Sequence, residues 1–152
     1  MVREQRDDRF ERMVADLQSL IDEKEQELYS AKVIHEARAP QNLGRMAAAD
    51  AQAIVRGWCG DTMEVYLRLA GNRIQEATFM TDGCGPTVAC GSMLTRMVQD
   101  ITLGEAAAIE AADLIIALEG LPPEHVHCAT LAVHTLHQAM EDGCPSGEER
   151  SE

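Results

Sequence analysis

Three cysteines of this 152-residue chain lie in settings that suit a metal ligand or a nucleophile. They are predicted at the ends of helices or strands, where the backbone changes direction: Cys59, Cys84 and Cys128. Glycine follows the first and flanks the second, and glycine lets the chain turn sharply and leaves a sulfur approachable. At the third, a helix amino terminus and the neighbouring His127 should favour the thiolate over the thiol.

The alternative is that each cysteine is a small buried apolar side chain, because free cysteine is among the most buried residue types. The three thiols are far apart in the chain and form no C-x-x-C pair, so spacing does not separate the two interpretations. Cys90 shares a predicted helix face with Leu94 and Met97, which favours a structural thiol. Cys144, beyond the last predicted helix, is taken as an incidental exposed thiol.

Composition narrows the classes of partner. The chain has 13 basic and 26 acidic side chains, a formal net charge of -13, which repels phosphate backbones and anionic lipid headgroups. We therefore expect no nucleic acid and no membrane partner. No apolar run approaches the roughly 20 residues that span a bilayer, and the charged amino terminus is unlike a secretory signal. This favours the cytoplasm, where reducing conditions make disulfides among the five cysteines unfavourable.

A long amphipathic helix is predicted from about Arg3 to Ala37, since this stretch has neither glycine nor proline. Apolar residues recur in it at helical spacing: Phe10, Val14, Leu17, Ile21 and Leu28. The stripe could dock on the body of the protein, which is the favoured interpretation, or pair with a second copy to form a homodimer. Lys24 interrupts the second arrangement.

The middle of the chain predicts a β-hairpin. Pro40 ends the helical region, and residues 63–69 alternate between apolar and polar as a half-buried strand does. A turn at Gly71-Asn72 then leads into a partner strand over residues 74–81, with Ile74, Ala77 and Phe79 facing inward.

The last part of the chain predicts helices. From residue 85 the apolar period becomes helical, Thr102 and Glu105 have the spacing of a capping box, and Asp113 can cap a helix over residues 114–118. Pro122-Pro123 precedes a final helix to about Met140, closed by Gly143. The order favours an α+β fold, a small antiparallel sheet packed against C-terminal helices, with an extra long N-terminal helix.

Several ordered motifs resemble the NifU/IscU-type iron-sulfur cluster assembly scaffold family, as in the NifU N-terminal domain. The resemblance runs from about Tyr29 to Met140. The segments that carry it are Tyr29-Ser30-Ala31-Lys32-Val33-Ile34, Pro40-Gln41-Asn42, Cys59-Gly60-Asp61-Thr62-Met63, Asp82-Gly83-Cys84-Gly85, and Leu121-Pro122-Pro123 leading to His127-Cys128. It divides the chain into an N-terminal helical extension (1–28), a scaffold domain (29–142) and a mobile tail (143–152).

The resemblance implies that the three cysteines are ligands of a 2Fe-2S cluster, that Asp61 governs its lability and that His127 is an alternative fourth ligand. Such a cluster needs four protein ligands and prefers thiolates, so three thiols with a carboxylate or imidazole would hold the fourth corner weakly. In the implied scheme a cysteine desulfurase passes sulfur to a thiolate, iron enters, and the cluster moves to apo iron-sulfur proteins. The scaffold itself is not an enzyme.

Two zinc-based alternatives stay open. One is a zinc-dependent sulfur acceptor, a branch of the same family with zinc among the same cysteines and aspartate. That branch carries an insertion for which residues 85–126 leave no spare length. The other is a structural zinc module, against which Asp61 and the glycine-exposed thiols argue. An empty three-thiolate site would also capture zinc readily.

Overall fold

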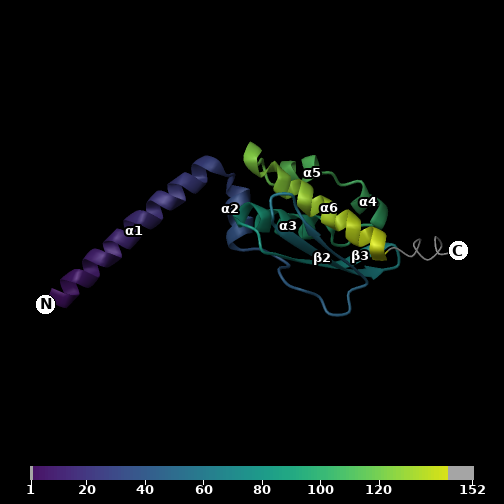
Figure 1. The fold of residues 1–152 in the computed structure, drawn as a ribbon, viewed down its shortest axis with the longest axis horizontal. Helices are drawn as coiled ribbons and strands as arrows, with labels where there is room; N and C mark the ends of the chain where they lie inside the picture. Colours follow the sequence, from purple (N-terminus) through teal and green to yellow (C-terminus); the bar gives the residue numbers. More distant parts are fainter. Residues whose placement is uncertain (1, 144–152) are drawn as a thin grey trace.

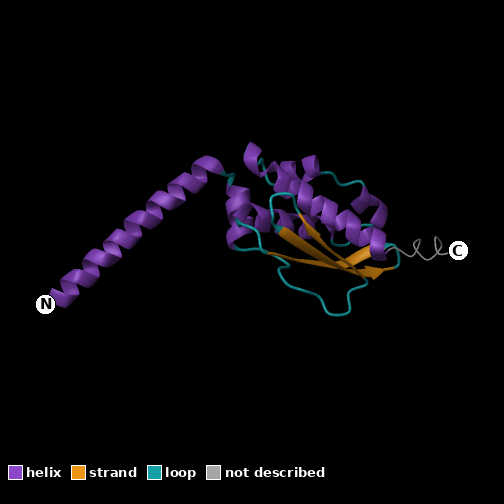
Figure 2. Ribbon diagram, in the orientation of Figure 1, coloured by secondary structure: helices purple, strands orange, loops and turns teal. Residues whose placement is uncertain are grey.

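The computed structural model describes residues 2–143 and the side chains of residues 7–142. Figure 1 shows the path of the chain and Figure 2 its helices and strands. The elements are, in order, α1 (Val2–Leu28), α2 (Ala31–Arg38), β1 (Ala51–Arg56), β2 (Thr62–Ala70), β3 (Arg73–Thr81), α3 (Gly85–Val98), α4 (Leu103–Ala107), α5 (Ala111–Ala117), a 3-10 turn (Pro123–His125) and α6 (Val126–Gly143).

The three strands form an antiparallel sheet in the order β1-β2-β3. The predicted hairpin is confirmed: Met63 pairs with Thr81, Val65 with Phe79, and a two-residue turn at Gly71-Asn72 joins the strands. Sequence analysis missed β1, because small alanines supply its two most buried positions and give a weak apolar signal.

Helices cover one face of this sheet, as Figure 2 shows. Helix α6 packs on β1 and β2, and α3 packs on β3. The largest side chains of the core are fully buried between the two layers: Phe79, Met63, Leu67, Ile74, Leu94, Leu114, Leu118 and Leu136. Sheet on one side and helices on the other make an α+β fold, as predicted.

The predicted helix from Arg3 to Ala37 is two helices, which corrects the sequence analysis. Ser30 separates them, because its side chain accepts a hydrogen bond from the backbone N–H of Val33 at 3.0 Å and so caps α2. A serine cap ends one helix and begins the next without glycine or proline. The favoured docking of the apolar stripe on the core was also wrong, because α1 projects away from the body (Figure 1).

The caps of the short helices follow the sequence closely. Thr102 and Glu105 form the predicted capping box at the start of α4. Asp113 does cap a helix, but from inside its first turn: its carboxylate accepts the N–H of Glu110 at 2.8 Å, and α5 begins at Ala111 rather than at residue 114. Cys144 and the predicted mobile tail lie outside the described residues, except for Gly143 at the end of α6.

Close packing of α3 on β3 depends on Gly91. A Cβ atom at this position would lie 2.3 Å from a ring carbon of Phe79, which is fully buried. We expect Gly91→Ala to lower the free energy of unfolding by about 3 kcal/mol and the Tm by about 10 °C. Thermal unfolding followed by circular dichroism measures this change.

The matched control is Gly104→Ala in α4, where the nearest atom to the added Cβ is 3.9 Å away. Alanine is the better helix former, so we expect its Tm to stay the same or rise slightly. Equal stability of the Gly91→Ala variant and the parent would contradict the packing of α3 on β3.

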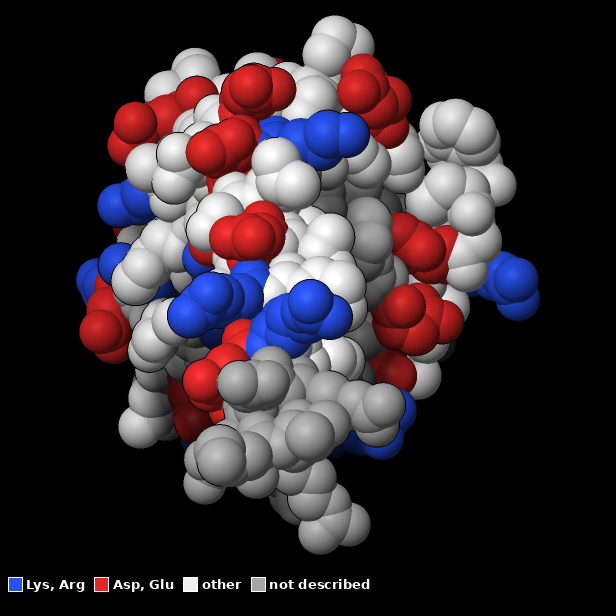
Figure 3. Space-filling view, turned by 90° about the vertical axis from the view of Figure 1, so that its left-hand side faces the viewer, with Lys and Arg blue, Asp and Glu red and all other residues white. Residues whose placement is uncertain are grey.

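Acidic and basic side chains are mixed on the face that Figure 3 presents, and no continuous basic patch covers it. Across the described residues, no helix is both long and apolar enough to cross a membrane.

Candidate functional site

The antiparallel register brings distant segments to one end of the sheet. The end of β1 pairs with the start of β2, where Arg56 lies opposite Thr62, and the start of β2 lies beside the end of β3. The β1–β2 loop and the segment after β3 are therefore neighbours. A hydrogen bond of 2.7 Å from the N–H of Thr62 to the Asp82 carboxylate ties them together.

The β1–β2 loop presents Cys59 and Asp61. The backbone N–H of Gly57 donates to the Asp61 carbonyl at 2.7 Å, which closes the loop, and Gly60 takes a φ of +99° that favours glycine. Cys59 at the tip is exposed, and the neighbouring Trp58 is 88% exposed. The loop thus holds a thiol and an aromatic ring in solvent.

The segment after β3 places Cys84 at the start of α3. Cys84 is the N-cap residue of this helix, and its side chain is exposed. The preceding Gly83 is required by a close approach, because a Cβ atom there would lie 2.7 Å from the Cβ of Thr87. The glycine predicted to expose the thiol also lets the first turn of α3 come near the strand end.

Cys128 comes from the first turn of α6 and is only 1% exposed. Its sulfur lies 3.3 Å from the hydroxyl oxygen of Thr87. The same hydroxyl is 3.1 Å from an Asp61 carboxylate oxygen and 3.9 Å from the Cys84 sulfur. Thr87 therefore links groups from three separate segments, although its single proton can go to only one of them at a time.

Sequence analysis missed Thr87. A threonine in the first turn of a helix is common and carries no chemical signal of its own. Helical spacing is the signal that could have indicated it, since Thr87 lies three residues after Cys84 and so shares its face of the helix. The side chain is completely buried, which fits a role in holding the site together.

The protonation of Cys128 differs from the expectation. Burial raises the pKa of the Cys128 thiol most, the Thr87 hydrogen bond lowers it, and repulsion between a Cys128 thiolate and the Cys84, Asp61 and Cys59 side chains raises it further. Desolvation outweighs the helix terminus, so the metal-free protein favours the thiol rather than the predicted thiolate.

Aromatic rings extend from the thiols along the surface. His127 Nε2 lies 3.7 Å from the Cys128 sulfur, and its ring centroid is 5.3 Å from that of Trp58. The ring centroid of His125 lies 6.3 Å from that of His127, and the Nε2 atom of His125 is 3.2 Å from the Tyr29 hydroxyl oxygen. His127 is therefore within reach of the thiols as a nitrogen donor.

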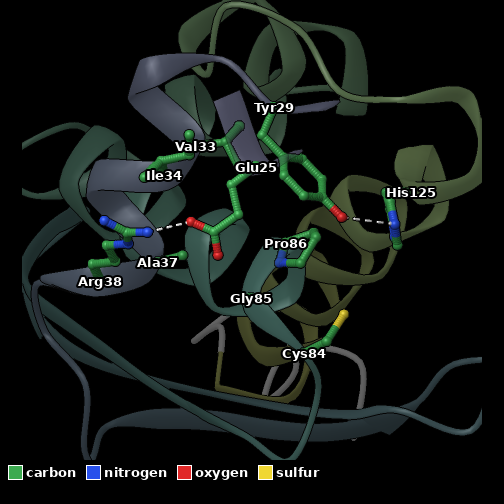
Figure 4. A pocket seen from close by; sticks show the side chains of 10 residues that line it. All are labelled: Glu25, Tyr29, Val33, Ile34, Ala37, Arg38, Cys84, Gly85, Pro86 and His125. Atoms are coloured by element: carbon green, nitrogen blue, oxygen red, sulfur yellow. Dashed lines mark hydrogen bonds and ion pairs between the residues drawn. The ribbon is translucent and has the colours of Figure 1, made fainter. Parts of the chain in front are cut away.

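Each exposed thiol opens onto a pocket of its own. Cys84 and His125 line a pocket of about 330 Å³ between α2 and α3, with the hydroxyl of Tyr29 directed at His125 (Figure 4). Most of its other lining is apolar, including Val33 and Pro86. Cys59 lines a second pocket of about 240 Å³ with His127. The thiols can thus be approached from two sides.

The remaining thiol of the described chain is structural. Cys90 is fully buried on the core face of α3, and burial raises its pKa well above the ordinary value. This confirms the structural interpretation from its helical position. Among the side chains of residues 7–142, no group of three or more His, Cys, Asp or Glu is already arranged to hold a metal ion. The site is therefore not a closed metal centre: Asp61, Cys84 and Cys128 surround the Thr87 hydroxyl, whereas Cys59 lies exposed in the adjacent loop.

The fold and the site define a class of small α+β proteins that gather thiols from three segments at one end of a short antiparallel sheet. The profile described as NifU-like N terminal domain matches residues 28–143, and the chain belongs to this family.

Among its relatives is the iron-sulfur cluster assembly scaffold protein IscU 1 of Archaeoglobus fulgidus, which is 37% identical over 76% of each chain. The IscU scaffold of Escherichia coli is 34% identical, covering 75% of this chain and 92% of its own. A solved structure of a NifU-like protein from Brucella abortus, 21% identical, superposes with a TM-score of 0.61 over 75% of this chain and 92% of that one. This last likeness confirms the fold.

Proposed function

We propose that this protein is an iron-sulfur cluster assembly scaffold that builds a labile 2Fe-2S cluster and transfers it to apo-proteins. The observation that carries the proposal is the Thr87 hydroxyl, which lies 3.1 Å from Asp61, 3.3 Å from Cys128 and 3.9 Å from Cys84. Two of the three proposed sulfur ligands and one oxygen donor thus meet at a single point. Thiolates are the preferred ligands of iron-sulfur clusters.

The arrangement suits a cargo that must arrive and leave. Cys128 is buried and anchored, whereas Cys59 and Cys84 are exposed and can turn toward incoming iron and sulfide. The fourth ligand in this proposal is Asp61 or His127, and either binds iron less firmly than a fourth thiolate. The cluster is therefore held by three firm bonds and one weak one, which favours release.

The relatives support this role, because the two IscU proteins named above are themselves called scaffolds of cluster assembly. In the proposal the sulfur donor is a cysteine desulfurase, and the acceptors are apo iron-sulfur proteins. The apolar pocket beside Cys84 offers a path for a donor's persulfide. The scaffold catalyses no reaction of its own and works in the cytoplasm. Residues 29–142 form the scaffold domain, with residues 1–28 as an extension and 143–152 as a tail.

Anaerobic reconstitution tests the proposal. The purified protein is incubated with a thiol reductant and either ferric iron and sulfide, or ferrous iron, cysteine and a pyridoxal-phosphate cysteine desulfurase. We expect the visible absorption of a 2Fe-2S centre, which disappears when an apo-ferredoxin is added and is replaced by the spectrum of the holo-ferredoxin. A protein that stays colourless under these conditions would contradict the scaffold role.

Zinc provides the comparison. If the protein is a zinc-dependent sulfur acceptor, it keeps stoichiometric colourless zinc during the same treatment and passes on only sulfur. If it is a structural zinc module, removing zinc with a chelator unfolds it. We expect neither, because the Cys59 and Cys84 side chains are exposed and a structural zinc site is closed. Zinc found in the purified protein would not distinguish these three functions, since three thiols capture zinc readily.

The role of Thr87 is tested by Thr87→Val, which keeps the shape of the side chain and removes the hydroxyl. Asp61 and Cys128 then lose their shared hydrogen-bonding partner. We expect the yield of reconstituted cluster to fall about tenfold, the lower end of the effects of groups that orient metal ligands. Thr87→Ser, which restores the hydroxyl, serves as the control. Equal yields in the valine variant and the parent would contradict this role.

A further inference from the structure

Helix α1 carries a stripe of apolar side chains that lies in solvent. Each of its members is between 47% and 63% exposed: Phe10, Met13, Val14, Leu17, Leu20, Ile21 and Leu28. The helix touches the body chiefly near its end, where Arg38 of α2 forms ion pairs with Asp22 and Glu25. Continuous apolar surface of this kind marks a contact with another molecule.

We propose that α1 pairs in an antiparallel two-stranded coiled coil with α1 of a second copy of this chain. Positions 10, 14, 17, 21, 24 and 28 are separated alternately by four and three residues, the spacing of the seam of a coiled coil. The body of the protein does not cover this seam as far as Ile21, because the apolar side chains of the seam remain about half exposed there. The second copy supplies the missing apolar partner.

One antiparallel register matches each seam position from 7 to 24 with a complement, and it sets Leu28 opposite position 3. In it Val14 lies opposite Leu17 of the second copy, and Phe10 opposite Ile21. At the flank of the seam, Met13 of one copy lies beside Leu20 of the other. The same register sets Lys24 opposite Asp7, both of which are exposed in the single chain. The lysine that interrupts the apolar stripe therefore faces an opposite charge, and this pair occurs twice in the dimer, once at each end of the seam.

The parallel arrangement is disfavoured by the same residues. It would set Lys24 against Lys24 and Asp7 against Asp7, and like charges at facing positions destabilise a coiled coil. It would also crowd both bodies at one end, because each body follows the carboxyl end of α1 (Figure 1). The antiparallel pair keeps the bodies at opposite ends of a rod about 40 Å long, the length of 27 helical residues.

Zero-length cross-linking tests the pairing directly. A carbodiimide condenses a carboxylate with an amine into an amide, taking up the water that is released. Within one helix Asp7 and Lys24 are 17 residues and about 25 Å apart, so an amide between them must join two chains. We expect mass spectrometry of the cross-linked dimer to find this amide, with Lys24 as one of only two lysines in the chain.

Sedimentation equilibrium of the full chain supplies the second measurement, with the metal-free protein kept reduced. We expect a species of twice the 16.6 kDa of one chain. Leu17→Asp should raise the dissociation constant at least about tenfold, because two carboxylates enter the middle of the seam. Ser19→Asp, on the opposite face of the helix, is the matched control and should leave the dissociation constant unchanged.

A charge exchange then fixes the orientation. Asp7→Lys alone and Lys24→Asp alone each place like charges together at two positions of the dimer, and each should raise the dissociation constant about threefold to tenfold. The double variant should restore it. A chain that is monomeric at all concentrations would overturn the proposal. A dimer whose double variant is no tighter than the single variants, or one without the Asp7–Lys24 amide, would overturn the antiparallel register.

Discussion

Replacement of Cys84 by alanine is expected to abolish stable cluster assembly, and the same result is expected for Cys59 and Cys128. With one thiolate removed, iron has only two firm ligands and one weak oxygen or nitrogen donor. Loss of a group that merely orients a ligand costs about 10–100-fold in metal affinity, so loss of a ligand should cost at least as much. The measurement is the visible absorption and the bound iron and sulfide after anaerobic reconstitution and desalting.

Two controls separate ligand loss from unfolding. Cys84 and Cys59 are exposed, so alanine there removes little packing, and the Tm should stay near that of the parent. Cys144→Ser lowers the number of thiols by one without touching the proposed ligands and should keep the full yield of cluster. A Cys84→Ala variant that still binds the parent's amount of cluster would exclude Cys84 as a ligand.

Replacement of Asp61 by alanine is expected to slow cluster transfer to an apo-ferredoxin by about tenfold, the lower end of effects seen for groups around a metal. Two physical reasons act together. A carboxylate is the hard, exchangeable member of the proposed ligand set and opens the iron to an incoming thiolate. Its charge also helps to raise the pKa of Cys128, so removing it favours the thiolate that anchors the cluster.

The Asp61→Asn variant tests which reason dominates. Asparagine removes the charge but keeps an oxygen near the Thr87 hydroxyl, 3.1 Å away in the parent. Transfer as slow as in the alanine variant would indicate that the charge matters most, and transfer at the parent rate would indicate that the oxygen does. Stopped-flow absorption of the ferredoxin product gives the rates. Rates that are the same in all three proteins would contradict the role proposed for Asp61.

The fold was largely predictable because its signals are local. Alternation over residues 63–69 and the Gly71-Asn72 turn predicted β2 and β3, and the capping box at Thr102 predicted the start of α4. Such signals act within a few residues and survive without tertiary context. The two failed predictions also have local causes. The Ser30 cap begins a new helix within an uninterrupted helical pattern, and the buried alanines of β1 give a weak apolar signal.

The candidate site was predictable as residue types but not as an arrangement. Glycines beside Cys59 and Cys84, together with the motifs shared with the family, are sequence features, and they indicate the thiols and Asp61. They do not indicate Thr87, nor the burial that raises the pKa of Cys128 above its ordinary value. Both depend on α3 and α6 packing on the same end of the sheet.

The sequence by itself determined most of the elements, which thiols are set among glycines and which charges lie along α1, because propensity, capping and periodicity are properties of neighbours in the chain. Tertiary structure alone decided that Asp61, Cys84 and Cys128 share one hydroxyl and that the stripe of α1 stays in solvent. The physical reason is that desolvation and hydrogen bonding act between groups close in space, and strand register and helix packing bring such groups together.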